Sequence, residues 1–336
     1  MALRESSAGT SNLERHESND MSMIVVVGVT GSGKSYFINR LAGKEIVEEG
    51  GKLNSCTQKC QMIPLIIGNT KTLLIDTPGF DDTQRPDAEI LNEIANVLAA
   101  QYALGFSLKG VVYVHRITDI RFSGSNVKTL EIMKRVCGEK ALKNVLLVTS
   151  RWNEVEEETG ADREHQLRDE FWAYMLAHGS CVSRFHGDRP SAISLVSQLL
   201  MKDSVVLRLQ HEIIDEGKKL NMTSAGAFVE NSLEEAREEY SKEIRNLQRL
   251  REELQENDRA MRRRWEADWA KEQAKLRSVE EQQDSLRRYV AEEVQKKIEE
   301  ETKSNTDALA GAELSRQISP EGILGEWVLA PSIPSS

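Results

Sequence analysis

The stretch that decides the fold of this chain is Gly28-Val29-Thr30-Gly31-Ser32-Gly33-Lys34-Ser35. It follows the apolar run 23–27 and leads into a helix-forming stretch at 36–42, which is the strand–loop–helix setting of the phosphate-binding loop GxxxxGK(S/T). The glycines allow backbone N–H groups to converge on phosphate oxygens, and the helix presents its positive N-terminal end to the same oxygens. We therefore predict that a nucleotide is bound by Gly28, Thr30, Gly31, Ser32, Gly33, Lys34, Ser35 and Tyr36.

A second motif, Asp76-Thr77-Pro78-Gly79, follows the strand-like run 71–75 about 42 residues after the loop lysine. In switch GTPases such an Asp holds Mg²⁺ through water, and the Gly N–H meets the γ-phosphate. An Asp-x-x-Gly run also describes ordinary turns, but its distance from the loop and its place at a strand end favour the nucleotide role. Thr57, between the two motifs, is predicted to close on Mg²⁺ and the γ-phosphate; the alternative is an ordinary loop threonine.

Together the two motifs predict a phosphate and metal site with divided roles. The lysine neutralises phosphate charge, and the glycine after the second strand senses the γ-phosphate. The predicted catalytic group is Lys34, Thr57 and Gly79. The predicted Mg²⁺ ligands are Ser35, Thr57 and Asp76.

The residue after Gly79 is Phe80, where switch GTPases often carry a water-orienting Gln. Because a phenyl ring cannot align a water by hydrogen bonding, we expect slow intrinsic hydrolysis that a partner or a second copy accelerates. His115 and Arg116 end a predicted strand and are candidate substitutes; a structural role is the alternative for both.

Base recognition is predicted at Ser150-Arg151-Trp152-Asn153, which follows the buried strand 145–149. Guanine selection in this fold normally uses Asn-Lys-x-Asp, whose Asp accepts hydrogen bonds from guanine N1–H and N2–H₂. Asn153 offers one donor and one acceptor instead, which leaves ATP or several nucleotides as alternatives to GTP. Arg151 can stack over the base. The predicted base contacts are Ser150, Arg151, Asn153, Ser191 and Ala192.

Composition narrows the class of protein. The chain has 336 residues and a net charge of −10, which argues against non-specific binding to nucleic acid. Residues 1–20 are polar and lack the form of a signal peptide, and no apolar run reaches the roughly 18 residues of a membrane span. The four cysteines are sparse for this length, so we expect reduced thiols and a cytoplasmic protein.

Strands and helices alternate between residues 22 and 202, which predicts an α/β fold: a Ras-like, doubly wound P-loop G domain. The Gly68-Asn69-Thr70 turn between two apolar runs adds one antiparallel hairpin. Residues 1–21 and 305–336 have the composition of disordered segments. A docked helix and a linker are expected over residues 203–228.

Residues 229–304 contain neither proline nor glycine and are dominated by charged side chains. Apolar residues recur at intervals of seven, which predicts one long helix, about 110 Å if unbroken, in a coiled coil. The seam is poor around residues 256–264, where we expect a bend. A solvated single helix is the alternative. The members of the seven-residue repeat are Leu233, Tyr240, Leu247, Leu254 and Met261.

The chain resembles the septin-like and immunity-associated branch of the translation-factor-class GTPases in the run 76–83. It is more similar to G-domain proteins abundant in fungi, over the stretches 110–121, 137–138, 148–153 and 209–226. This resemblance spans about residues 22–228 and implies a GTP-binding fold. That family often has Asp where Asn153 stands, so the departure bears on base specificity.

The sequence therefore predicts a GTP- and GDP-binding, Mg²⁺-dependent GTPase. Its nucleotide state would control G-domain pairing, and the coiled coil would hold a homodimer or recruit protein partners. Two alternatives stay open, a nucleotide-binding scaffold without turnover and an ATPase or promiscuous triphosphatase.

Overall fold

A computed structural model describes residues 21–48, 59–82, 85–253 and 259–287 of this chain. Its centre is a six-stranded sheet in the order β2-β3-β1-β4-β5-β6. All neighbouring strands are parallel except β2 and β3, which form the expected antiparallel hairpin. The strands are β1 Ser22–Val27, β2 Gln61–Ile67, β3 Thr70–Asp76, β4 Ser107–Arg116, β5 Val145–Ser150 and β6 Cys181–Arg184. This is the predicted mixed α/β G-domain sheet.

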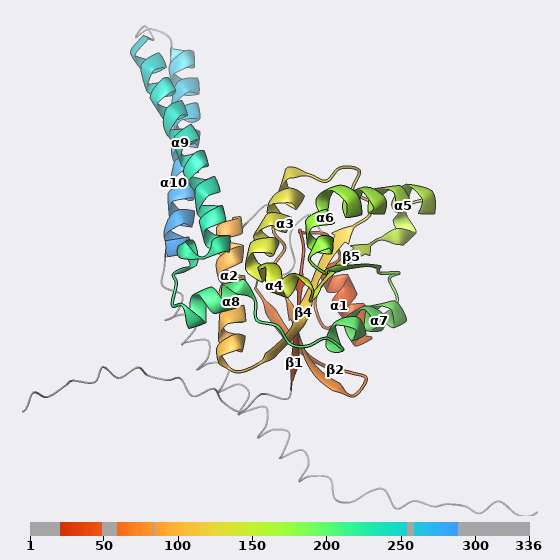
Figure 1. The fold of residues 1–336 in the computed structure, drawn as a ribbon. Coiled ribbons are helices and arrows are strands. Elements are labelled where there is room, and N and C mark those ends of the chain that lie inside the picture. The colour runs from red at the N-terminus through yellow and green to blue at the C-terminus, as the bar shows by residue number, and fades with distance from the viewer. Residues whose placement is uncertain (1–20, 49–58, 83–84, 254–258, 288–336) are drawn as a thin grey trace, which may run out of the picture.

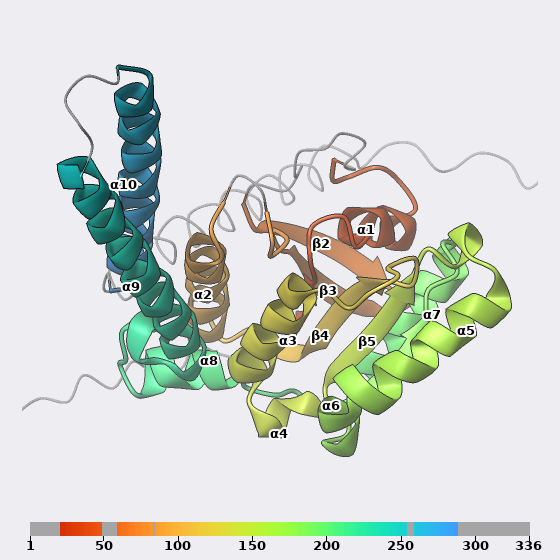
Figure 2. The same ribbon diagram turned by 90° about the horizontal axis from the view of Figure 1, so that it is seen from above.

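Two layers of helices cover the two faces of the sheet (Figure 2). The reason is visible in β1, which is buried along its whole length and sends alternate side chains into two different apolar cores. One core contains α1 Lys34–Ala42 and α7 Arg189–Leu200, and the other contains α2 Asp87–Ala103 and α3 Gly124–Cys137. The second layer also includes α4 Glu139–Leu142, α5 Glu157–Gln166, the π-helical turn Leu167–Phe171 and α6 Ala173–Ala177.

Short helical turns, rather than one helix, follow the sheet where a docked helix was expected. They dock on α2, because the Gln210 side chain donates from Nε2 to the Leu98 carbonyl at 3.0 Å. The next helix begins at Ser224, ahead of the predicted boundary at residue 229. The turns are α8 Arg208–Gln210, the π-helical turn His211–Asp215 and the 3-10 turn Leu220–Met222.

The prediction of one continuous helix over 229–304 is wrong. Two helices, α9 Ser224–Glu253 and α10 Arg259–Arg287, lie side by side (Figure 1). Late positions of α10 contact early positions of α9, so the two helices are antiparallel. Residues 254–258 and 288–304 lie outside the described residues. The pairs that join the helices are Trp265–Leu247, Gln283–Glu234 and Arg287–Glu230.

This helical hairpin is fastened to the G domain at its base. Val229, Leu233, Val279 and Leu286 are buried in the same core as α2 and α3. The guanidinium of Arg135 on α3 lies 4.3 Å from the ring centre of Phe228. The apolar stripe read as an intermolecular seam is therefore partly used inside one chain. None of the described helices has the length and apolar character needed to cross a membrane.

Candidate nucleotide-binding site

The phosphate loop connects the end of β1 to α1, as predicted. Gly31 and Gly33 adopt φ angles of +78° and +96°, which side chains rarely tolerate. A Cβ atom on Gly28 would lie 2.4 Å from the Val114 carbonyl oxygen, so the loop passes β4 at a distance that only glycine permits. The Ser32 hydroxyl is buried, with no hydrogen-bond partner in the described residues. A buried hydroxyl without a partner fits an anion that the loop would hold.

Lys34 lies inside the loop and is 6 % exposed. Its ammonium donates to the carbonyl oxygens of Gly28 at 3.1 Å and Val29 at 3.2 Å. Burial lowers the pKa of Lys34 to about 8, while the negative charges of Asp76 and Asp82 act in the opposite direction. A buried ammonium that is bonded to two carbonyl oxygens is suited to receive phosphate oxygens.

The second motif lies directly beside the loop because β3 is the parallel neighbour of β1. The register pairs Val26 with Asp76 and leaves the aspartate fully buried at the carboxyl edge of the sheet. The Thr30 N–H donates to the Phe80 carbonyl at 3.0 Å. A Cβ atom on Gly79 would lie 2.5 Å from the Thr30 nitrogen, so position 79 has room only for glycine. The two predicted motifs therefore form one site.

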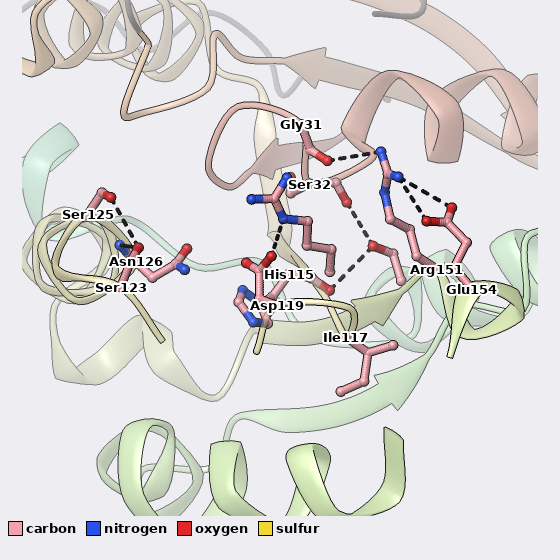
Figure 3. Close-up of polar contacts among 12 residues, drawn as sticks. Gly31, Ser32, His115, Ile117, Asp119, Ser123, Ser125, Asn126, Arg151 and Glu154 are labelled. Carbon is pink, nitrogen blue, oxygen red and sulfur yellow. Dashed lines mark hydrogen bonds and ion pairs between the residues drawn. The ribbon is translucent and has the colours of Figure 1, made fainter. Parts of the chain in front are cut away.

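The segment predicted to recognise the base also reaches the loop (Figure 3). Ser150 Oγ donates to the Ser32 carbonyl at 2.7 Å, and the Arg151 guanidinium donates to the Gly31 carbonyl at 3.3 Å. Asn153, by contrast, is exposed and has no polar contact to the loop among the described residues. Sequence reasoning missed Glu154, whose carboxylate accepts two hydrogen bonds from Arg151 at 3.1 and 3.3 Å. The only signal for it was an acidic residue next to the atypical Asn153.

Ser191 and Ala192 have local roles at the start of α7. The Ser191 N–H donates to the Asp188 side chain at 2.8 Å, which caps the helix, and its hydroxyl donates to the Asp188 carbonyl at 3.0 Å. Ala192 is buried in the core. Tyr36 has a contact nearby, because its hydroxyl donates to the Gly187 carbonyl at 3.0 Å. The base contacts of Ser150, Arg151, Asn153, Ser191 and Ala192 stay predictions.

The candidate pair at the end of β4 lies behind the loop. Arg116 donates from Nε to Asp119, and its Nη1 would be 3.2 Å from a Cβ atom on Gly31. His115 is 3 % exposed, and its ring packs near Phe122 with centres 5.3 Å apart. Burial lowers the pKa of His115 to about 4; Asp119 opposes this shift and Arg116 adds to it. The imidazole is therefore neutral near pH 7, which leaves both the catalytic and the structural role of His115 as predictions.

The residues that could hold Mg²⁺ are only partly described. Ser35 begins α1 and Asp76 ends β3, so a hydroxyl and a carboxylate come from the two elements that meet at the phosphate loop. Such oxygen donors suit Mg²⁺, which takes its remaining ligands from phosphates and water. Thr57, the third predicted ligand, lies outside the described residues, as does Cys56.

Comparison with known proteins agrees with this geometry. The model of the AIG1 family matches residues 22–174, slightly under half of the chain. GTP-binding protein A of Dictyostelium discoideum is 27% identical over 132 residues, which are 39% of this chain and 28% of that protein. Immune-associated nucleotide-binding protein 3 of Arabidopsis thaliana is 31% identical over 134 residues, which are 40% of this chain and 39% of that protein.

The chain thus spans less than two fifths of the length of these curated relatives. A solved structure, Toc33 of Arabidopsis thaliana in complex with GDP and Mg²⁺, is similar with a TM-score of 0.46 and 16% identity, over 56% of this chain and 88% of that one. The fold assignment itself rests on the strand order and connections described above. The family match and the relatives support an AIG1-type, GTP-binding G domain over residues 22–174.

Proposed function

We propose that this chain binds GTP and GDP with Mg²⁺ and hydrolyses GTP slowly, as a nucleotide-controlled switch of the septin and immunity-associated type. The observation that carries the proposal is the meeting of two strand ends. Lys34 lies buried in a glycine-rich loop, and Asp76 and Gly79 arrive beside it from the neighbouring strand. Charge, hydroxyl and backbone donors then converge on one place, which is what phosphoryl transfer requires of a protein.

In this proposal each part of the site has its own task. Lys34 and the loop N–H groups bind the phosphates, and the Gly79 N–H reports whether the γ-phosphate is present. Bound Mg²⁺, held by Ser35, Asp76 and the proposed Thr57, would neutralise charge on the β and γ phosphates. Because Phe80 is joined to the loop through its backbone, a change at position 79 is transmitted directly to Val29 and Thr30.

A second candidate function is a nucleotide-binding scaffold without turnover. Phe80 favours it, because its ring is buried in the core with 1 % exposure and has no group that could orient a water. A third candidate, an ATPase or promiscuous triphosphatase, is favoured by the exposed amide of Asn153 in place of a carboxylate. The three candidates predict different outcomes in one set of measurements.

The experiment measures binding of GTP, GDP and ATP by calorimetry, with and without Mg²⁺, and then phosphate release at low and high protein concentration. We expect Mg²⁺-dependent binding that prefers GTP, and a specific activity that rises with protein concentration. Tight GTP binding with no phosphate release at any concentration would favour the scaffold. Preferential binding and turnover of ATP would overturn the GTPase proposal.

Pairing of two G domains is part of the same proposal. Because Phe80 cannot orient a water, a second copy could complete the site, and we propose a homodimer formed through the G domains. The helical hairpin would hold or recruit protein partners. The sparse cysteines support a cytoplasmic location. Light scattering with GDP and with a non-hydrolysable GTP analogue measures the molar mass and so tests the pairing. The mass of a monomer with both nucleotides would exclude it.

A further inference from the structure

Glu154 occupies a position next to the phosphate loop that no sequence motif assigns. Its carboxylate accepts hydrogen bonds from Arg151 Nη1 at both oxygens, at 3.1 and 3.3 Å. The same guanidinium donates from Nη2 to the Gly31 carbonyl at 3.3 Å, and Figure 3 shows Arg151 between Gly31 and Glu154. A carboxylate is therefore tied through one arginine to the loop that would hold the phosphates.

The backbone keeps this carboxylate in place. Arg151 adopts a left-handed conformation with φ of +63°, which is uncommon for a residue with a side chain and turns the chain sharply after β5. The Glu154 N–H donates to the Arg151 carbonyl at 3.1 Å and closes the 3-10 turn Trp152–Glu154. Ser150 Oγ fixes the strand end by donating to the Ser32 carbonyl at 2.7 Å. A side chain on this turn is oriented by the sheet and the loop together.

The turn is also braced on its outer side. The Trp152 indole donates to Thr149 Oγ1 at 3.0 Å, and the Arg184 guanidinium lies 3.9 Å from the indole ring centre. Arg184 is itself held by Glu164 at 2.7 Å. The Glu154 side chain is 47% exposed, so its carboxylate is accessible to a ligand while it pairs with Arg151.

We propose that Glu154, and not Asn153, reads the base and selects guanine. A carboxylate has about four acceptor sites, so pairing with Arg151 leaves acceptors for guanine N1–H and N2–H₂. Adenine has no N–H at either position, and xanthine would place its C2 carbonyl against the carboxylate. The guanidinium of Arg151 offers a flat face for the base. This inference rests on the proposed function, since it concerns the same nucleotide site.

The test measures the affinities of GTP, ATP and XTP by calorimetry with Mg²⁺ for the full chain and three variants. Glu154→Gln replaces two acceptors by one donor and one acceptor, which matches xanthine better than guanine. We expect it to weaken GTP binding by about 10- to 100-fold and to strengthen XTP binding, with ATP unchanged. Glu156→Gln, an exposed glutamate two residues further on, is the matched control and should leave all three affinities unchanged.

Asn153→Asp separates the two candidate readers of the base. If Glu154 already reads guanine, a new carboxylate at 153 should change the GTP-to-XTP ratio by less than about threefold. A large gain in GTP preference from Asn153→Asp, with no effect of Glu154→Gln, would overturn the inference. So would an equal loss of GTP, ATP and XTP in Glu154→Gln, because it would assign Glu154 only to holding Arg151 against the loop.

Failure of the inference and failure of the proposed function give different results. If the unmodified chain binds none of the three triphosphates, the proposed function and the inference both fall. If it binds them and only the response to Glu154→Gln is absent, the nucleotide site stands and guanine selection by Glu154 does not.

Discussion

The sheet edge around the phosphate loop and the helical hairpin over residues 224–287 place different requirements on their sequences. At the sheet edge, function needs particular residues at fixed spacings, such as glycine where the loop passes β4. In the hairpin, many apolar and charged residues at roughly the right intervals suffice for either folding back or pairing with another chain. Motifs therefore identify the sheet edge in the sequence. The packing of the hairpin depends instead on which apolar surface covers its helices.

The largest difference between the two regions should follow from Lys34→Ala. Removing the buried ammonium should lower triphosphate affinity on the order of 1,000-fold, because its charge-assisted bonds to phosphate are made away from water. The hairpin should be unaffected, so the helical circular dichroism should match that of the unmodified chain. Calorimetry with GTP and Mg²⁺ provides the measurement. Lys44→Ala, an exposed lysine just after α1, is the matched control, and retained affinity in Lys34→Ala would contradict the site.

Leu286→Ala tests the comparison by changing the helical hairpin instead of the sheet edge. Leu286 on α10 is fully buried against the G-domain core, so its truncation should lower the free energy of unfolding by about 3 kcal/mol. Nucleotide affinity should stay within about twofold, since the leucine is remote from the phosphate loop. Urea unfolding measures the loss, with Asp284→Ala on the exposed side of the same helix as the control. Single substitutions typically lower the free energy of unfolding by about 1 kcal/mol. A loss below about 0.5 kcal/mol would therefore mean that the hairpin does not dock on the G domain in solution.

His115→Gln tests how a buried imidazole at the sheet edge makes the free energy of unfolding depend on pH. Because the folded pKa of His115 is about 4, below the ordinary value of 6.5, the unfolded chain binds a proton between these pH values that the folded chain does not. Its contribution is fully present above pH 6.5 and is lost as pH falls towards 4. Between pH 7 and pH 5 the imidazole should account for about 2 kcal/mol of lost stability. Urea unfolding at both pH values should show a smaller loss in His115→Gln; an identical loss in the two proteins would contradict the burial of a neutral imidazole.

The smallest effect is expected at the ion pair that joins the two helices near the base of the hairpin. Arg287 Nε donates to Glu230 Oε1 at 2.8 Å, but the arginine side chain is 50% exposed. A double-mutant cycle of Arg287→Ala and Glu230→Ala should give a coupling energy of about 0.5 kcal/mol, reduced further by salt. A coupling above 2 kcal/mol would show that polar pairs, rather than apolar burial at Leu286, set the register of the hairpin.

Much of the G domain could be predicted, because each motif directly follows a buried strand. The carboxyl ends of parallel strands lie at one edge of the sheet, which brings the motifs together. The meeting of Lys34 with Asp76 followed from two strand ends at one sheet edge, and the hairpin across Gly68 followed from its turn. The roles of the individual site residues, Thr57, Asn153, Ser191 and Ala192 among them, stay predictions. Glu154 could not be predicted, because its approach to Arg151 depends on the left-handed turn at the end of β5.

The packing partner of the C-terminal helices could not be predicted from the sequence. A repeat of seven marks a surface that must be covered, but it does not say whether a second chain, α10 or the G domain covers it. Gly226 lies inside α9, where a Cβ atom would be 1.8 Å from the Leu220 carbonyl oxygen. Close packing on the preceding turn, rather than flexibility, explains that glycine.

The sequence by itself determined the phosphate loop, the second motif, the alternating strands and the helical character of the C-terminal region, because each depends on local spacing and composition. Only the tertiary structure decided that α9 and α10 fold back on the G domain and that Arg151 joins Glu154 to Gly31. These contacts link residues far apart in the chain or on opposite sides of a sharp turn. Their partners are selected by burial and geometry, which no local pattern records.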